Sequence, residues 1–106
     1  MNIIITGGCG FVGSSLCLYL KKNLKGSKIL SIDNLSKNYS RFNQKILKKN
    51  NIENKKINLG KLNSSKHVNF KADIIIDCSA EPAVEISKKK IVKFIENNFI
   101  STLNIL

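Results

Sequence analysis

The sequence of 106 residues contains no tryptophan, one proline, one histidine and three cysteines. The odd number and irregular spacing of the cysteines fit no disulfide framework. The cysteines form no CxxC pair and there is only one histidine, so the spacing expected of a Cys/His zinc site is missing. No apolar run reaches the length of a membrane span, and no positively charged segment typical of a signal peptide opens the chain. We therefore expect a cytoplasmic protein with reduced thiols, no metal and no membrane partner.

Acidic residues are also scarce, and 7 of them against 18 basic residues give a formal net charge of +11. Arg41 is the only arginine, and within the basic segment 37–71 Glu53 is the only acid. A nucleic-acid surface usually combines Arg with Lys and interleaves aromatic residues for stacking. The composition thus favours a solvated lysine face over a nucleic-acid surface. Salt-dependent binding to a duplex would support the nucleic-acid alternative.

Short apolar runs alternate with helix-like segments, an order typical of an α/β fold with a parallel sheet. The nearly all-apolar, β-branched run at 2–6 predicts a strand buried on both faces. Residues 28–32 and 73–78 predict two further strands, and 55–59 predicts a weaker strand. Apolar residues at helical spacing predict three helices. These are a segment with Val12, Leu16, Tyr19 and Leu20 that ends near Gly26, residues 39–49 with Phe42, Ile46 and Leu47, and residues 90–106 with Ile91, Phe94, Ile95, Phe99, Thr102, Leu103 and Leu106.

A glycine-rich segment, residues 6–13, lies between the first predicted strand and the first predicted helix. In its pattern Gly7-x-x-Gly10-x-x-Gly13, the first glycine allows a tight turn, the second lets the backbone approach a pyrophosphate, and the third lets helix and strand pack closely. The helix N-terminus presents free N–H groups and a positive dipole end to phosphates. The segment therefore predicts a dinucleotide-binding loop.

An acidic residue follows at the distance that such a site requires. Asp33 ends the second predicted strand, about 20 residues beyond Gly13, where a carboxylate can accept both ribose hydroxyls of an adenosine. The same charge repels a 2′-phosphate, so we expect NAD rather than NADP as the cofactor. The structural alternative is a plain turn at Asp33-Asn34.

A triphosphate-binding loop of the Walker A type is excluded by one residue. Gly8 and Gly13 have the spacing of such a loop, but Ser14 stands where a lysine must reach the β- and γ-phosphates.

With these residues, the sequence resembles the extended short-chain dehydrogenase/reductase superfamily, and within it the NAD-dependent nucleotide-sugar epimerases and dehydratases. One block is the TGGxGFVGS loop at 6–14, and a second is residues 31–37, similar to the DNLSR segment of CDP-paratose (CDP-tyvelose) 2-epimerases. The third is residues 74–106, whose end, 98–106, is similar to the family's NVxGTLNLL. The resemblance implies the N-terminal part of a Rossmann-type doubly wound parallel sheet with strand order 3-2-1-4.

The resemblance also implies a role for individual residues in holding NAD. The pyrophosphate would be wrapped by Gly7, Gly10, Phe11, Val12 and Gly13. The adenosine ribose would be held by Asp33, Asn34 and Ser36, while Ser79, Ala80 and Asn98 would contact the cofactor further along. Three positions depart from the family: Asp77 replaces a histidine, Ser79 replaces the usual alanine, and Lys61 replaces an aspartate that contacts adenine.

The catalytic pair of the family is missing from these residues. Its enzymes transfer a hydride with the help of a Tyr-x-x-x-Lys pair, in which the lysine lowers the pKa of the tyrosine. Here Tyr19 and Tyr39 are followed four residues later by Asn23 and Asn43, so we assign no catalytic residue. We expect residues 1–106 to be the N-terminal, NAD-binding portion of a homo-oligomeric enzyme that acts on a nucleotide sugar.

An incomplete sheet would leave residues 73–78 as an apolar edge strand and would expose the apolar face of the last helix. The exposed side chains would be Phe94, Phe99, Leu103 and Leu106. The alternative is a stand-alone, non-catalytic dinucleotide-binding module whose edge strand is covered by self-association.

Overall fold

The computed structural model describes residues 1–60, 68–79 and 99–105. In these residues four parallel strands form one sheet in the order β3-β2-β1-β4. The strands are β1 (Asn2–Thr6), β2 (Lys28–Ile32), β3 (Glu53–Lys55) and β4 (Ile74–Asp77), and the helices are α1 (Phe11–Asn23), α2 (Ser40–Lys49) and α4 (Ser101–Ile105). The predicted fold class and strand order are confirmed.

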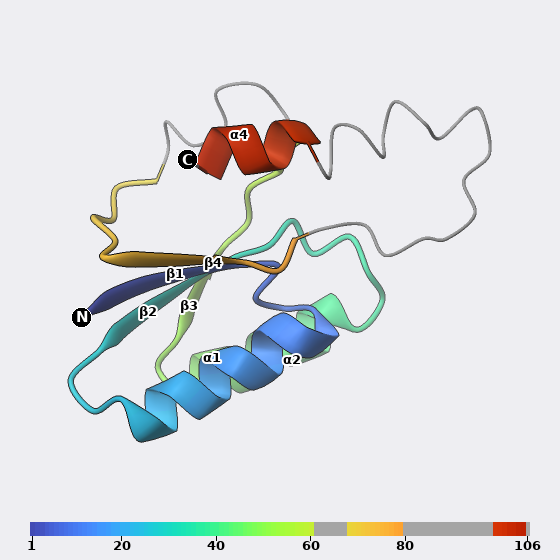
Figure 1. Ribbon diagram of the computed structural model, residues 1–106. Helices are drawn as coiled ribbons and strands as arrows, with labels where there is room; N and C mark the ends of the chain where they lie inside the picture. Colours follow the sequence, from blue (N-terminus) through green and yellow to red (C-terminus); the bar gives the residue numbers. More distant parts are fainter. Residues whose placement is uncertain (61–67, 80–98, 106) are drawn as a thin grey trace.

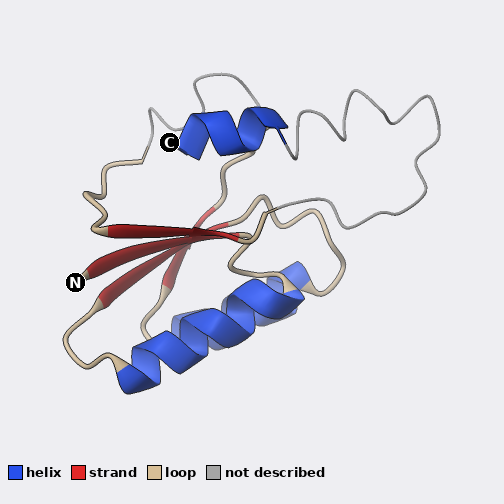
Figure 2. Cartoon of the chain, viewed as in Figure 1, coloured by secondary structure: helices blue, strands red, loops and turns tan. Residues whose placement is uncertain are grey.

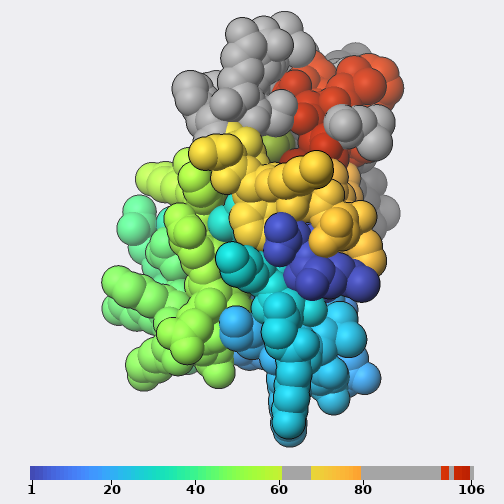
Figure 3. Space-filling model, turned by 90° about the vertical axis from the view of Figure 1, so that its left-hand side faces the viewer, coloured from blue at the N-terminus to red at the C-terminus, as the bar shows by residue number. Residues whose placement is uncertain are grey.

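Strand β1 occupies the centre of the sheet because it has no polar residue among its middle positions. Ile3, Ile4 and Ile5 are all buried, as expected for a parallel strand with neighbours on both edges and cover on both faces. Ile3 pairs with Ile29 of β2 on one side and with Ile74 of β4 on the other. In Figure 3 the N-terminal residues and the β4 segment accordingly lie next to each other at the surface.

The helices lie on both faces of the sheet, with α1 and α2 side by side on one face and α4 on the opposite face (Figures 1 and 2). Ile3 and Ile5 pack in one apolar cluster with Cys17 of α1 and Leu47 of α2. Ile4 belongs to a second cluster, which α4 joins through its last residue. Each fully buried aliphatic side chain contributes roughly 1.5–3 kcal/mol, so alternation along β1 holds both helical layers to the sheet.

The carboxyl ends of the parallel strands meet at one edge of the sheet, and backbone hydrogen bonds extend slightly past the strands there. Gly7 N–H donates to the Ile32 carbonyl (2.7 Å), and Cys78 N–H donates to the Thr6 carbonyl (3.1 Å). The loops that leave β1, β2, β3 and β4 therefore start from fixed points at the same edge. In open α/β sheets this edge is where ligands bind.

The sequence predicted β1 and β2 with the bounds that the structure has, and it predicted β4 within one residue at each end. The predicted strand at 55–59 was wrong, since β3 is Glu53–Lys55. Ile57 and Leu59 follow β3 and pack on the α4 side of the sheet. Their apolar alternation belongs to a loop that covers the core rather than to a strand.

Two of the predicted helices are present, but their apolar faces differ from the prediction. Val12 and Tyr19 are both 63% exposed in α1, and Phe42 is 66% exposed in α2. Gly13 and Cys17 are the buried residues of α1, and Leu47 is the buried apolar residue of α2. The predicted helix at 90–106 appears as α4 at its end, and its residues 90–98 and 106 lie outside the described part.

Strand β4 is an edge strand, as the sequence predicted. Ile74 and Ile75 are each 43% exposed, and Phe99 and Leu103 on the α4 side are exposed as well. Phe94 and Leu106, which were also expected to be exposed, lie outside the described residues. Within residues 1–60, 68–79 and 99–105, no helix has the length and apolarity needed to cross a membrane.

Candidate functional site

The glycine loop turns sharply out of β1 and leads into α1. Gly7 adopts φ +64°, a left-handed conformation that glycine reaches without a steric cost. A Cβ on Gly7 would overlap the backbone carbonyl of Cys78. The Gly10 N–H donates to the Gly7 carbonyl at 3.0 Å and closes the loop. Gly10 then serves as the N-cap of α1 in extended backbone, without a side-chain cap, so the helix N-terminus stays open toward the loop.

The first turn of α1 approaches the glycine loop closely at Gly13. A Cβ there would overlap the carbonyl group of Gly7, so only glycine permits this spacing between helix and loop. The sequence predicted that Gly13 lets helix and strand pack closely; the contact found is with the loop that leaves β1. Phe11 and Val12, between Gly10 and Gly13, leave their side chains exposed.

Asp33 follows β2 and ties two backbone segments together. Its Oδ2 accepts the N–H of Cys9 in the glycine loop (3.1 Å), and its Oδ1 accepts the N–H of Leu35 (2.8 Å). A carboxylate has about four lone-pair sites, so these bonds leave acceptor capacity for a ligand. The alternative of a plain turn is incomplete, because the carboxylate also reaches across to the loop after β1.

The turn after Asp33 is held in an uncommon shape. Asn34 repeats the pattern, since its Oδ1 accepts the N–H of Ser36 at 3.1 Å. Leu35 between them has φ +59°, which is rare for a residue with a Cβ and marks a locally strained backbone. Two consecutive side-chain-to-backbone hydrogen bonds stabilise this turn and fix the direction of residues 34–36.

The wall on the β4 side consists of Cys78 and Ser79. The Cys78 N–H donates to Thr6 of β1 at both the carbonyl and the Oγ1, each at 3.1 Å. Ser79 donates its backbone N–H and its hydroxyl to Asp77 Oδ1, at 3.1 and 2.7 Å. The wall is thus fixed against the end of β1 and against the preceding residue.

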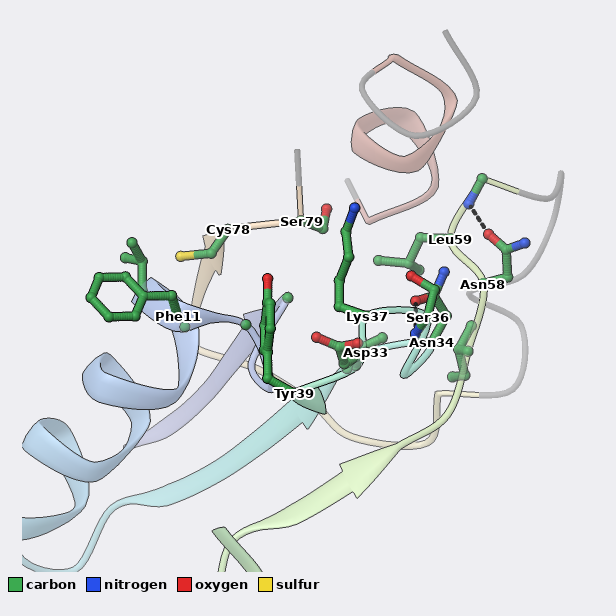
Figure 4. Close-up of a pocket in the computed structure, with 17 residues that line it drawn as sticks. Phe11, Asp33, Asn34, Ser36, Lys37, Tyr39, Asn58, Leu59, Cys78 and Ser79 are labelled. Atoms are coloured by element: carbon green, nitrogen blue, oxygen red, sulfur yellow. Dashed lines mark hydrogen bonds between the residues drawn. The ribbon is translucent and has the colours of Figure 1, made fainter. Parts of the chain in front are cut away.

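These three segments enclose one pocket of about 440 Å³ with the loop after β3. It is lined by Gly7, Gly10, Phe11, Val12, Gly13, Ile32, Asp33, Asn34, Ser36, Lys37, Tyr39, Ile57, Asn58, Leu59, Gly60, Cys78 and Ser79. Figure 4 shows Asp33 between the labelled side chains of Tyr39 and Asn34, with Cys78 and Ser79 across from them. A volume of several hundred Å³ with a few polar groups is typical of small-molecule and cofactor sites.

Nine of the eleven predicted cofactor-binding residues line this pocket. They are Gly7, Gly10, Phe11, Val12, Gly13, Asp33, Asn34, Ser36 and Ser79. The other two, Ala80 and Asn98, lie outside the described residues. The structure therefore brings together three stretches that are far apart in the sequence, while the contact of each residue with NAD stays a prediction.

Sequence reasoning missed the part of the pocket that follows β3. Asn58, Leu59 and Gly60 line it, and Asn58 Oδ1 accepts the Gly60 N–H at 3.0 Å (Figure 4). The prediction concentrated on Lys61, which lies outside the described residues. The signal that would have found this loop is its position directly after a strand of a parallel sheet, the same rule that located residues 33–36.

Lys37 and Tyr39 were missed for a different reason. They follow the predicted ribose turn, where no spacing rule assigns a function, yet both side chains line the pocket. Asn43 of α2 holds this region to the glycine loop, because its Nδ2 donates to the Cys9 carbonyl at 2.9 Å. The start of α2 therefore belongs to the site.

The three cysteines are free thiols. Burial is the main reason that the pKa of Cys9 rises to about 11, with the charge of Asp33 adding to it and a hydrogen bond with Ser31 opposing it. Burial likewise raises the pKa of Cys17 to about 12. The pKa of Cys78 is raised by burial and by the charge of Asp77. Across residues 1–60, 68–79 and 99–105, no three His, Cys, Asp or Glu residues group as metal ligands.

Residues 3–106 match the family model described as "NAD dependent epimerase/dehydratase family". The chain belongs to this family. The predicted resemblance is thereby confirmed, and NAD, the cofactor expected from Asp33 and the glycine loop, is the cofactor on which the family depends.

Similar proteins include both dehydratases and epimerases of the family. The chain is 40% identical over 107 residues to a dTDP-D-glucose 4,6-dehydratase of Dictyostelium discoideum, covering 95% of this chain and 24% of the relative. A dTDP-glucose 4,6-dehydratase from Bacillus anthracis, solved with NAD, is 27% identical with a TM-score of 0.77, covering 99% and 32%. A UDP-glucose 4-epimerase from Thermotoga maritima, solved with UDP-glucose, is 25% identical with a TM-score of 0.79, also covering 99% and 32%.

The chain spans about a quarter to a third of the length of these family members. The part that it matches is their Rossmann-like N-terminal portion, which agrees with the strand order found here.

Proposed function

We propose that this chain binds NAD in the pocket at the carboxyl edge of its sheet and serves as the cofactor-binding portion of an enzyme that acts on nucleotide sugars. The observation that carries the proposal is the convergence of the glycine loop, Asp33 and Ser79 on one pocket of about 440 Å³. NAD, when bound, supplies a nicotinamide that accepts a hydride from a sugar carbon and returns it. Membership of an NAD-dependent family of sugar epimerases and dehydratases supports this assignment.

The open N-terminus of α1 is the proposed binding site for the pyrophosphate. Gly7, Gly10, Phe11, Val12 and Gly13 would surround the phosphates. The N–H groups of Gly7 and Gly10 are bonded to the Ile32 and Gly7 carbonyls, so the N–H groups of the first helical turn, at Phe11, Val12 and Gly13, are the proposed donors. The helix dipole adds a partial positive charge there. No acidic residue lies in the first turn of α1, so nothing in that turn competes with a phosphate.

The turn after β2 is the proposed binding site for the adenosine ribose. Asp33 has acceptor capacity beyond its bonds to Cys9 and Leu35, and Asn34 and Ser36 lie beside it in the pocket. Its carboxylate favours hydroxyls and repels a 2′-phosphate, which supports NAD over NADP. Ser79 would lie along the cofactor, and Ala80 and Asn98 are proposed to extend the same contact.

The proposed chemistry requires residues that this chain does not contain. Hydride transfer in the family needs an acid/base group whose pKa lies near the operating pH. Neither Tyr19 nor Tyr39 has a lysine four residues later, so the family's Tyr-x-x-x-Lys pair is missing here. Residues 1–106 would therefore bind and orient the cofactor, while proton transfer and sugar recognition depend on other parts of the enzyme. A homo-oligomeric enzyme is part of the same proposal.

The test is calorimetric titration of the chain with NAD, NADP and ADP-ribose. We expect saturable 1:1 binding of NAD and ADP-ribose and weaker binding of NADP. The variant Gly10→Val should abolish binding, because a side chain there meets only the Gly7 carbonyl at 3.1 Å and otherwise projects into the pocket. Gly26→Ala is the control, since a Cβ added at Gly26 would meet no atom within 4 Å and Gly26 does not line the pocket. Absence of NAD binding in a folded wild-type chain would overturn the proposal.

The catalytic part of the proposal has its own test. The chain mixed with NAD and dTDP-glucose or UDP-glucose should produce no absorbance at 340 nm, the band of reduced nicotinamide. Formation of that band would place an acid/base group within these 106 residues and would contradict the assignment of binding without catalysis.

A further inference from the structure

Asp77 is the last residue of β4, and its carboxylate receives hydrogen bonds from three separate segments. Oδ1 accepts the hydroxyl of Thr6 at the end of β1 and both the N–H and the hydroxyl of Ser79. Oδ2 accepts the hydroxyl of Thr102 in α4 at 3.2 Å. The side chain itself does not line the pocket. Its four hydrogen bonds instead connect the pocket wall to the sheet and to a helix 25 residues further along the chain.

The wall that Asp77 holds is in contact with the glycine loop. Thr6 uses its Oγ1 twice, as donor to Asp77 and as acceptor from the Cys78 N–H. The Cys78 carbonyl lies so close to Gly7 that a Cβ on Gly7 would overlap it. A shift of Cys78 or Ser79 would therefore change the shape of the pocket at the loop proposed to bind the pyrophosphate.

Helix α4 reaches the opposite wall of the same pocket. Asn104, two residues after Thr102, donates its Nδ2 to the carbonyl of Leu59 at 2.6 Å. Leu59 lines the pocket on the β3 side, and Ser79 lines it on the β4 side. One short helix thus contacts both sides, and the β4 contact passes through the Asp77 carboxylate.

We propose that Asp77 is a positioning residue for the cofactor: its carboxylate fixes the Cys78–Ser79 wall of the pocket and couples that wall to α4. This inference rests on the proposed function, because it assumes that NAD occupies the pocket. It extends that function to a residue outside the pocket lining.

The donor set explains why a carboxylate suits this position. Four neutral donors converge on it, and a carboxylate offers about four lone-pair sites and no competing donor. An asparagine would keep Oδ1 for Thr6 and Ser79 and would place an NH₂ donor against the Thr102 hydroxyl, which can accept. Asp77→Asn should therefore retain most of the hydrogen bonds at this position, whereas Asp77→Ala removes all of them.

Asp73 provides a matched control at the other end of the same strand pair. It precedes β4, and its Oδ2 accepts the N–H of Asn2 at 2.8 Å. Asp73→Ala therefore removes a carboxylate that joins β4 to β1, as Asp77→Ala does, but far from the pocket lining. If both residues merely hold strands together, the two variants should behave alike in every binding experiment.

The experiment measures the affinity of wild type, Asp77→Ala, Asp77→Asn and Asp73→Ala for NAD and for AMP, at a temperature where each is folded. We expect Asp77→Ala to weaken NAD binding by on the order of tenfold, the loss of hydrogen bonds to a charged group. AMP, which reaches only the adenosine end of the pocket, should lose less than threefold. Asp77→Asn should recover most of the NAD affinity, and Asp73→Ala should leave both affinities unchanged. Equal losses for NAD and AMP, or equal effects of the two alanine variants, would overturn the inference.

Amide hydrogen exchange provides a readout that needs no ligand. In Asp77→Ala the Ser79 N–H should exchange faster, together with amides of α4, and in Asp73→Ala it should not. Unchanged exchange at Ser79 in Asp77→Ala would overturn the positioning role. A wild-type chain that binds no NAD would instead contradict the proposed function, while the exchange data would still decide whether Asp77 holds the wall.

Discussion

The backbone N–H of Cys9 donates a hydrogen bond to the carboxylate of Asp33 at 3.1 Å. This bond joins the glycine loop, which follows β1, to the turn that follows β2. The two segments proposed to hold the pyrophosphate and the ribose are therefore one connected unit. A change in either segment is expected to affect the other.

Asp33→Ala should weaken the binding of NAD more than that of NADP. The variant removes an acceptor for the ribose hydroxyls, which lowers the affinity for NAD. For NADP it also removes a charge that repels the 2′-phosphate, and this gain offsets part of the loss. Asn43→Ala is the matched control, because Asn43 supports the Cys9 carbonyl without carrying a charge. It should reduce both affinities by a similar factor. Equal losses of NAD and NADP in Asp33→Ala, measured by calorimetry, would refute the ribose assignment.

Gly13→Ala should lower the free energy of unfolding by about 1–3 kcal/mol, the usual cost of overpacking, because the added methyl overlaps the Gly7 carbonyl. It should also weaken NAD binding, since the loop must shift. Gly26→Ala places a Cβ at φ +81° in open space and should cost about 1–2 kcal/mol with no loss of affinity. Urea unfolding and NAD titration of both variants test this. Unaltered binding in Gly13→Ala would show that the close contact is dispensable.

Stability should depend on pH through Asp77. Burial alone would raise the pKa of this carboxyl, but hydrogen bonds from Thr6, Ser79 and Thr102 lower it below the usual value of 3.8. A group with a lowered folded-state pKa stabilises the fold above its unfolded pKa and loses that contribution as the pH falls through the folded value. The stability difference between wild type and Asp77→Asn should therefore be constant from pH 7 to about 5 and shrink below pH 4. Urea unfolding at pH 7, 5 and 3 measures this stability difference. The same difference at all three pH values would contradict a stabilising role of the ionised Asp77 carboxylate.

The thiols should differ in reactivity toward a disulfide reagent such as DTNB. Cys78 is partly exposed and lines the pocket, whereas Cys9 and Cys17 are buried. One thiol per native chain, that of Cys78, should react with the reagent. The reaction should be slow at neutral pH because the pKa of Cys78 is raised, and it should become faster as the pH rises. Saturating NAD should slow it, and Cys78→Ser should remove it. Two or more equivalents in the native chain would show that the core around Cys9 opens.

The sequence predicted β1, β2 and β4 to within one residue at each end and misplaced β3. Asn2–Thr6 and Lys28–Ile32 were identified correctly because short apolar runs next to glycine-rich or polar turn residues are typical of buried strands in an α/β protein. The run at 55–59 misled because Ile57 and Leu59 are buried by a loop that covers the core. Helical spacing likewise cannot tell which apolar residues face the sheet, and Phe42 and Tyr19 proved to be exposed.

The candidate site was predictable where chemistry imposes a spacing, as between Gly7 and Gly13 and on to Asp33. It was not predictable where contacts come only from the packing of distant segments. Tyr39 and Asn58 line the pocket because their loops start from neighbouring strand ends. No local sequence pattern indicates that these two loops meet. The bonds of Asp77 to Thr6 and Thr102 depend on the register of β1 with β4 and on the position of α4, which only the fold supplies.

The central position of β1 has a consequence for the order in which the chain can fold. Its partner β2 begins at Lys28, but its other partner β4 begins at Ile74. During synthesis, β1, α1, β2 and α2 can therefore assemble while one edge of β1 still lacks a neighbour. Pairings between residues far apart in sequence form slowly, and an apolar strand with an open edge is a template for pairing with another chain. A ribosome that pauses between β3 and β4 would thus leave one edge of β1 unpaired at the moment when the nascent chain is most prone to aggregate.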